Sequence, residues 1–307
     1  MSRCRATVLW NPAAGRGGAG ARWDRARREI EARFDITVVP MDLSGAWRVE
    51  IGGAVAAGVR TFVAAGGDGT VHALVEALAA EEPAITLDAF TLGAVGLGSS
   101  NDFEKPGGAV PSCGVPCRLD ADAAAPRDIV RVAWKDGSRR SRQSVLVVSG
   151  SIGLVAEGNA LFSRSFLRRL FTGPAIAAAA LGAIIRHRPL FARLSHAGGS
   201  EEIWLSSLSV LKTPWLSGSL RFDIPIAPDD GLLVAALCTR MSRPQLLGTL
   251  IGLSRGHFHG RVGTRVLRSP WFELAADEPF LLELDGEVVE AREVRFDLFP
   301  RRIRSCA

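Results

Sequence analysis

A buried strand, a glycine-rich loop and the start of a helix follow one another without a gap in residues 61–80. The apolar run 61–65 predicts the strand, the loop reads Gly66-Gly67-Asp68-Gly69-Thr70, and residues 70–80 have the apolar spacing of a helix. Glycines let the backbone approach an anion closely, and the first N–H groups of a helix point towards it. Asp68 would repel a bare phosphate, so the pattern favours a phosphate bound together with Mg²⁺. For this loop alone, a turn that merely caps the helix is an equal alternative.

Two further loops of the same kind favour the phosphate site. A strand predicted over 5–10 leads into the loop 11–20, which begins Asn11-Pro12 and contains Gly15. A strand predicted over 91–95 leads into the loop 96–103, which contains Gly98, Ser99, Asn101 and Asp102. In an open α/β sheet, the loops at the carboxyl ends of the strands line one crevice, where ligands bind. None of the three loops has the Gly-Lys-Ser/Thr of a Walker motif or the complete dinucleotide fingerprint.

The chain changes character near residue 128. Before it, strands predicted over 5–10, 35–39, 61–65 and 91–95 alternate with helices predicted over 20–33, 45–58 and 70–80. This alternation predicts an N-terminal α/β domain with a parallel sheet over 1–127. After it, short alternating segments separated by turn residues predict a C-terminal antiparallel β-sandwich over 128–307, whose final strand could return to the first domain. The segments are 129–134, 144–149, 203–211, 219–226, 232–237, 271–275, 280–284 and 293–298.

The charge and cysteine content narrow the choice of partners. The 37 Lys and Arg residues against 32 Asp and Glu give a net charge of +5, which favours an anionic partner such as a nucleotide or an acidic membrane surface. Five scattered cysteines predict a reducing compartment, and we expect a cytoplasmic protein. Without a basic and aromatic platform, we expect no nucleic-acid partner. The sequence leaves open whether the chain forms a homodimer.

Residues 161–185 interrupt the strand-rich half with an aromatic and basic stretch followed by an almost wholly apolar one. The apolar part is too short to span a bilayer as a helix. Packing of a helical insertion on the sheet is the favoured interpretation. The alternative is an interfacial element, with Arg164, Arg168 and Arg169 facing an anionic membrane.

Two Asp-Gly sequences in the second half are typical hairpin turns. They are Asp229-Asp230-Gly231 and Asp285-Gly286, the latter followed by Glu287. A turn alone explains both. The functional interpretation adds that a carboxylate held on a rigid turn beside a crevice can act as a general base for a hydroxyl.

Together, these segments resemble the diacylglycerol kinase catalytic family, which includes bacterial lipid kinases and sphingosine kinases. The resemblance covers nearly the whole chain in order. It rests on Asn11-Pro12 with Gly15, the complete Gly66–Thr70 motif, the loop 97–103 (LGSSNDF, similar to the family's LGTGNDFAR), Asp229-Asp230-Gly231, and Leu284-Asp285-Gly286-Glu287. One glycine motif would be weak evidence, whereas five in the same order are strong.

The resemblance implies a two-domain kinase, with ATP on a phosphofructokinase-like first domain and the lipid entering from the second. It assigns Asp285 as general base and Asp68 as the residue that orients Mg²⁺. Glu287 would support either Asp285 or a water molecule bound to the metal. Asp230 would brace the domain interface through a structural ion. The implied nucleotide and metal contacts are Asn11, Pro12, Gly15, Gly66, Gly67, Gly69, Thr70, Gly98, Ser99, Asn101 and Asp102. The expected protein is peripherally associated with the inner face of the membrane.

The chain departs from the family pattern at a few positions. The usual Asn-Glu pair after the Gly66–Thr70 motif is His72-Ala73 here, the Thr-Gly of the third loop is Ser99-Ser100, and its Ala-Arg is Glu104-Lys105. Ser100 would restrict the loop if that position needs a positive φ.

The leading hypothesis is an ATP- and Mg²⁺-dependent lipid kinase acting on diacylglycerol, a sphingoid base or ceramide. An NAD kinase or phosphofructokinase relative is a second hypothesis, because such enzymes have a similar Gly-Gly-Asp-Gly loop, although the 97–103 loop is foreign to NAD kinases. A catalytically silent lipid or nucleotide sensor is the third, supported only by His72, Ala73 and Ser100.

Overall fold

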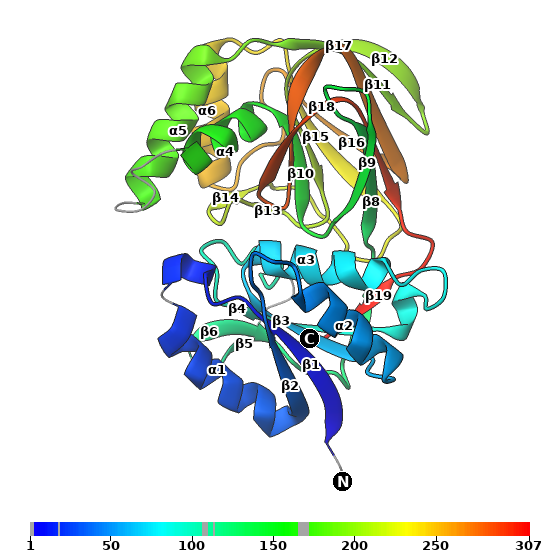
Figure 1. Ribbon diagram of the computed structural model, residues 1–307. Helices are drawn as coiled ribbons and strands as arrows, with labels where there is room; N and C mark the ends of the chain where they lie inside the picture. Colours follow the sequence, from blue (N-terminus) through cyan, green and yellow to red (C-terminus); the bar gives the residue numbers. More distant parts are fainter. Residues whose placement is uncertain (1–2, 18, 106–109, 113, 165–171) are drawn as a thin grey trace. The chain divides into compact units, whose positions relative to one another are not determined.

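The computed structural model describes residues 1–307 except 1–2, 18, 106–109, 113 and 165–171. The chain divides into two compact units, each with its own core (Figure 1). The N-terminal unit comprises residues 1–129 and 299–307, and the C-terminal unit comprises residues 130–298.

The N-terminal unit is built on a sheet whose strands β2, β1, β3 and β4 lie side by side in that order and run parallel. All six residues of β3 are buried, which explains its continuous apolar sequence, since a parallel strand is covered on both faces. The strands of this sheet are β1 (Cys4–Trp10), β2 (Phe34–Pro40), β3 (Thr61–Gly66), β4 (Thr91–Gly96), β5 (Val110–Ser112), β6 (Val115–Arg118), β7 (Ala125–Arg127) and β19 (Ile303–Ser305).

Helices cover both faces of this sheet, with α1 on one face and α2 and α3 on the other (Figure 1). Trp23, Ala26 and Ile30 of α1 recur at helical spacing and pack in one core with Val8 of β1 and Val63 of β3. The helical segments are α1 (Ala19–Arg33), α2 (Trp47–Ala56), α3 (Asp68–Ala79) and the 3-10 turns η1 (Ala14–Gly17) and η2 (Leu87–Ala89).

The end of the chain lies in the N-terminal unit. Strand β19 pairs in parallel with β4 and antiparallel with β7. An ion pair between Arg302 Nε and the buried Asp128 Oδ1, 2.7 Å apart, fixes the return of the chain beside the point where it leaves this unit. Residues 299–307 thus join the sheet that residues 4–10 began.

The C-terminal unit is antiparallel, in the strand order β16-β15-β12-β10-β17-β18-β8-β9. Strands β10 and β11 share the place between the long strands β12 and β17, because both pair with each of them. The strands are β8 (Val130–Lys135), β9 (Ser141–Leu146), β10 (Ser149–Gly153), β11 (Leu190–His196), β12 (Gly199–Leu211), β15 (Leu233–Thr239), β16 (Thr264–Ser269), β17 (Trp271–Leu284) and β18 (Glu287–Leu298), with a short pair β13 (Trp215–Leu216) and β14 (Leu220–Arg221).

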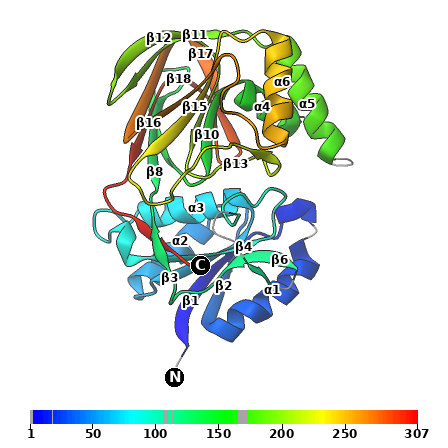
Figure 2. The ribbon, with the colours of Figure 1, turned by 180° about the vertical axis from the view of Figure 1, so that it is seen from behind.

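Three helices gather beside this antiparallel sheet: α4 (Leu154–Arg164), α5 (Thr172–Arg186) and α6 (Arg243–Ser254) (Figure 2). They contribute to a second core of the unit, in which Ile184 of α5 and Leu246 of α6 pack with Leu211 of β12. The predicted fold class, an α/β unit with a parallel sheet followed by an antiparallel unit, is confirmed. The strands β11 and β16 and the helix α6 were not predicted, and only two residues of the predicted strand 219–226 pair as a strand.

Candidate active site

The three glycine-rich loops meet at the carboxyl ends of the adjacent strands β1, β3 and β4. The N–H of Asn11 donates to Ala65 O (2.9 Å), and its side-chain Nδ2 donates to Thr70 Oγ1 (3.1 Å). On the other side, the N–H of Gly98 donates to Gly66 O (3.1 Å). The central loop is therefore tied to both neighbours, and the predicted residues from three distant segments lie together.

Asp68 links the central loop to the third loop. It is the first residue of α3, and its Oδ1 accepts the N–H of Phe103 at 2.9 Å. A carboxylate at a helix N-terminus is stabilised by the helix dipole. The same side chain thus helps to fix the mutual position of two loops, a structural role that the sequence motif alone does not reveal.

The glycines of this cluster differ in what surrounds them. A Cβ on Gly98 would lie 2.5 Å from the Cα of Gly67, so the central and third loops are in backbone contact. A Cβ on Gly66 would lie 2.1 Å from Thr70 Oγ1, and one on Gly15, whose φ is +55°, would collide with the Arg22 guanidinium. Gly69 is the opposite case, because nothing lies within 4 Å of the corresponding point and the residue is exposed. Gly69 therefore marks an open approach to the start of α3.

The third loop is held by its own side chains. The Oδ1 of Asn101 accepts the N–H of Gly98 (2.9 Å), and its Nδ2 donates to Gly98 O (3.2 Å) and Gly96 O (3.3 Å). The positive φ of this loop falls on Asn101 (+52°) and not on Ser100, so the serine at the family's glycine position imposes no left-handed strain. Asp102 is buried and forms an ion pair with Lys105 (2.7 Å). Among the predicted contacts, Ser99 and Pro12 are exposed.

A buried carboxyl group lies directly behind this loop. Glu104 is 0 % exposed, and no hydrogen-bond partner is recorded for either of its carboxyl oxygens among the described residues. Burial and the nearby Asp68 raise its pKa to about 8, against the opposing effect of Arg118 and Arg127. Arg118 donates to the Glu104 backbone carbonyl (3.0 Å), and the Arg127 guanidinium lies 4.1 Å from the centre of the Phe103 ring. Sequence reasoning found Glu104 as a departure from the family but gave it no role.

His72 and Ala73, the other departures, are both buried within α3. They lie beyond the first residues of the helix, in its body.

Asp285 occupies a two-residue hairpin turn in the C-terminal unit. Strand β17 ends at Leu284 and β18 begins at Glu287, and both Asp285 (φ 47°) and Gly286 (φ 99°) are left-handed, as a tight Asp-Gly hairpin requires. The Asp285 carboxylate accepts three backbone N–H groups, from Val147 to Oδ2 (2.8 Å) and from Val148 (2.9 Å) and Ser149 (3.0 Å) to Oδ1. The turn holds this carboxylate in one orientation, at 8 % exposure of the residue.

Glu287, Glu283 and Asp230 also lie near turns of this unit. Glu287, which was predicted to support Asp285 or a metal-bound water, is exposed. Instead the buried Glu283 contacts the turn, because its Oε1 accepts the N–H of Gly286 (2.5 Å). Asp230 bonds within its own loop, where its Oδ1 accepts the N–H of Leu232 (3.1 Å).

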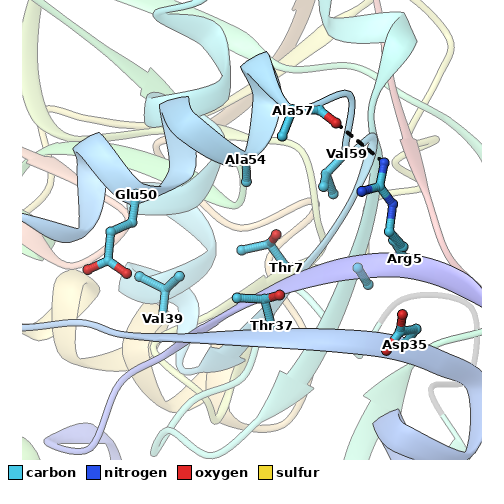
Figure 3. Close-up of a pocket in the computed structure, with 10 residues that line it drawn as sticks. Arg5, Thr7, Asp35, Thr37, Val39, Glu50, Ala54, Ala57 and Val59 are labelled. Atoms are coloured by element: carbon cyan, nitrogen blue, oxygen red, sulfur yellow. Dashed lines mark hydrogen bonds between the residues drawn. The ribbon is translucent and has the colours of Figure 1, made fainter.

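A cavity of about 390 Å³ in the N-terminal unit lies apart from these loops (Figure 3). It is bounded by β1, β2 and α2, and Thr7, Thr37 and Ala54 are among the residues that line it. It contains none of the predicted site residues, so we do not assign the active site to it.

The segment 161–185 is only partly described. Residues 161–164 end α4 and 172–185 belong to α5, whereas Arg168 and Arg169 lie outside the described residues. Over the described part of the chain, none of the helices has the length and apolar character needed to cross a bilayer.

Comparison with known proteins identifies the family. Residues 5–115 match the diacylglycerol kinase catalytic domain. A protein from Xanthomonas oryzae pv. oryzae called "Probable lipid kinase YegS-like" is 31% identical over 261 residues, which cover 82% of this chain and 80% of that protein. A protein of the same name from Pseudomonas aeruginosa is 29% identical over 255 residues, covering 82% and 78%.

Solved structures show the same fold. A diacylglycerol kinase from Bacillus anthracis superposes with a TM-score of 0.69 at 15% identity, covering 98% of this chain and 96% of that one. Yeast NADH kinase superposes with a TM-score of 0.52 at 11% identity, covering 100% and 84%. The fold is therefore shared with an NADH kinase. The relatives found by sequence, which are called probable lipid kinases, distinguish the lipid kinases from the NADH kinase. The chain belongs to the family of lipid kinases that carry the diacylglycerol kinase catalytic domain.

Proposed function

We propose that this lipid kinase transfers the γ-phosphate of ATP to a hydroxyl of diacylglycerol or a related lipid such as a sphingoid base or ceramide, with Asp285 as general base. The observation that carries this proposal is the Asp285 carboxylate, oriented by three backbone N–H groups on a hairpin turn. A base must be held in a fixed direction to take a proton from a hydroxyl. The family signature at 284–287 supports the same residue.

In the proposed reaction, the lipid hydroxyl gives its proton to Asp285 as its oxygen bonds to the γ-phosphorus. The bond between that phosphorus and the β–γ bridging oxygen breaks, and the bridging oxygen leaves with ADP. Asp285 then releases the proton to solvent. Most of the barrier in such transfers is lowered by positioning and charge neutralisation, so the rigidity of the turn serves the chemistry directly.

The loops of the N-terminal unit suit the ATP phosphates. Gly67 and Gly98 bring the backbones of the central and third loops together, and Gly69 leaves the start of α3 open to an anion. The Mg²⁺ that the family implies would neutralise phosphate charge when bound. Asp68 fits it, because magnesium in kinases is held by one or two carboxylates together with the substrate phosphates.

The test is phosphate transfer from labelled ATP, with Mg²⁺, to mixed micelles of diacylglycerol, ceramide, sphingosine or monoacylglycerol, with NAD as a soluble acceptor. Labelled lipid is the expected result and names the substrate class. Label on NAD would assign the chain the activity of the NADH kinase that shares its fold. Binding of ATP without transfer to any acceptor would favour the silent sensor.

Gly69 and Gly98 provide a matched pair for the nucleotide site. Gly69→Ala adds a methyl group in open space at a helical position, so we expect unchanged or slightly higher stability, by up to about 1 kcal/mol, but at least roughly tenfold weaker ATP binding. Gly98→Ala collides with the Gly67 backbone and should lower the free energy of unfolding by about 1–3 kcal/mol. Urea unfolding and ATP titration of both variants check this. Normal ATP affinity in Gly69→Ala would show that the ATP phosphates do not bind at this loop.

We also propose that α5 and α6 approach an anionic membrane. Two apolar residues four positions apart are exposed on each helix, Leu181 (49 %) and Ile185 (57 %) on α5 and Leu247 (40 %) and Ile251 (44 %) on α6. The helices lie side by side in both views (Figures 1 and 2), so these side chains supply two neighbouring apolar faces. A lipid kinase has to reach a substrate embedded in a bilayer, and such faces suit an interface.

Replacing Ile185 and Ile251 together by glutamate should lower partitioning onto anionic vesicles at least about tenfold, because two apolar side chains would no longer enter the interface. Val49→Glu is the matched control, since Val49 is 79 % exposed on α2 of the N-terminal unit. Vesicle sedimentation measures both. Equal partitioning of the double variant and the control would show that α5 and α6 do not contact lipid.

A further inference from the structure

The loop 227–232, which resembles the family's structural magnesium site, has a cationic side chain beside it. Lys212 follows β12 directly, and its side chain is 0 % exposed. Its Nζ donates to Leu232 O (3.0 Å) and Ala227 O (3.2 Å) and lies 3.5 Å from Asp230 Oδ1. The ammonium group therefore lies among a carboxylate and two carbonyl oxygens of the loop 227–232.

These oxygens are of the kind that a hard cation binds, but their spacing fits nitrogen. Mg²⁺ requires oxygens at about 2.0–2.1 Å in a near-octahedral arrangement. The three oxygens lie 3.0–3.5 Å from the Lys212 nitrogen, the range of N–H···O contacts. An ammonium has three N–H donors, and these oxygens are acceptors within their reach. The residues present thus do not fit a magnesium ion while Lys212 occupies this position.

The shape of the loop explains why a cation is needed there. The N–H of Leu232 donates to Asp230 Oδ1 (3.1 Å), and Gly231 has a φ of +72°, so the chain turns tightly around the carboxylate. The turn brings a negative charge and two carbonyl dipoles to the same point. A positive charge at that point offsets their mutual repulsion. A buried ammonium in turn requires such partners to replace its lost water.

We propose that Lys212 is the resident cation of the loop 227–232, so that this loop keeps its conformation without a divalent metal ion. The magnesium role predicted for Asp230 is thereby replaced by an internal ion pair. A divalent ion placed among the same oxygens would be a close neighbour of the ammonium, and like charges at such a distance repel, most strongly on the side of the buried Lys212 side chain. This inference does not depend on which lipid the protein phosphorylates.

The test compares thermal unfolding in EDTA and in millimolar Mg²⁺, without nucleotide. The natural chain should show no difference in Tm between the two that depends on Asp230. Lys212→Met keeps the stem but removes the charge, and it should lower Tm in EDTA by on the order of 10 °C, because Asp230 and two carbonyls lose their cation. Mg²⁺ should restore part of this loss in a saturable way, since the vacated oxygens can then accept an ion.

Asp230→Asn provides the control. In the Lys212→Met background it should raise Tm in EDTA and abolish the response to Mg²⁺, because the uncompensated carboxylate is gone. If Lys212→Met does not fold, the test uses Asp230→Asn in the natural chain, and this variant should lower Tm by the same amount in EDTA and in Mg²⁺. The proposal is overturned if the natural chain shows a saturable rise of Tm with Mg²⁺ that Asp230→Asn removes. A rise that persists in Asp230→Asn supports the proposal, because that ion binds elsewhere.

Discussion

Asp285→Asn is expected to lower the rate of lipid phosphorylation about 1000-fold while the affinity for ATP stays unchanged. The amide keeps the size of the carboxylate but cannot take a proton from the lipid hydroxyl. Three backbone N–H groups, from residues 147–149, converge on the native side chain. One carboxylate oxygen becomes an NH₂ group in the variant, so at least one of these hydrogen bonds is lost and a moderate fall in stability, about 1–3 kcal/mol, is also expected.

The measurement has to separate the loss of a base from the loss of the turn. Initial rates at saturating ATP and lipid give the first, and urea unfolding gives the second. Glu283→Gln is the matched comparison, because it alters the other carboxyl group that contacts the turn, through the N–H of Gly286. We expect it to destabilise the turn with a much smaller effect on rate. A rate for Asp285→Asn within tenfold of the natural chain would refute the assignment of the base.

The elements of the N-terminal unit could be predicted from the sequence because each carries a strong local signal. The strands predicted over 5–10, 35–39, 61–65 and 91–95 correspond to β1 to β4. The signal is strongest in β3 and β4, since buried parallel strands are continuous apolar runs. In the C-terminal unit the alternation is weaker. In strand β11, exposed Phe191 and Arg193 alternate with buried Ala192 and Leu194. Only residues 187–189 separate this strand from α5, and the sequence analysis did not distinguish it from the helical segment before it.

The residues of the candidate site could be predicted from the sequence, but the contacts between them could not. The motifs placed Asp68 and Asn101 in the site, yet only the structure shows that both hold the third loop, through Phe103 and Gly98. Lys212 lies 18 residues before Asp230 and has no motif of its own, so no local pattern could connect them. Glu104 was visible only as a departure from the family. Its pKa depends on charges as distant in the sequence as Arg118 and Arg127, and local sequence carries no such information.

The pH dependence of stability should contain a large contribution from Glu104. Its pKa is raised from 4.5 to about 8, first by burial and then by Asp68, while Arg118 and Arg127 act in the opposite direction. Below pH 4.5 the carboxyl group is protonated in both the folded and the unfolded chain and contributes no difference. Between pH 4.5 and 8 the folded chain binds a proton that the unfolded chain has lost, so the free energy of unfolding falls as pH rises.

Each unit of pKa shift corresponds to about 1.4 kcal/mol, so the full effect of Glu104 is on the order of 5 kcal/mol. Glu104→Gln keeps the shape of the protonated acid and cannot ionise. We therefore expect the variant and the natural chain to be about equally stable near pH 4.5, and the variant to be more stable at pH 8 by most of that amount. Urea unfolding across this range, in nucleotide-free protein, measures the difference directly.

Glu50→Gln is the control for this series, because Glu50 is exposed on α2 and its substitution should leave the pH dependence unchanged. A difference between Glu104→Gln and the natural chain that stays constant from pH 5 to 8 would mean that Glu104 ionises in the folded chain as readily as in water. A difference that grows with pH would mean that the loop 96–103 rests on a carboxyl group that is neutral at physiological pH. The position occupied by alanine in the family's motif would then carry a group whose ionisation opposes the packing of this loop, and alkaline conditions would loosen the segment that Asp68 holds in place.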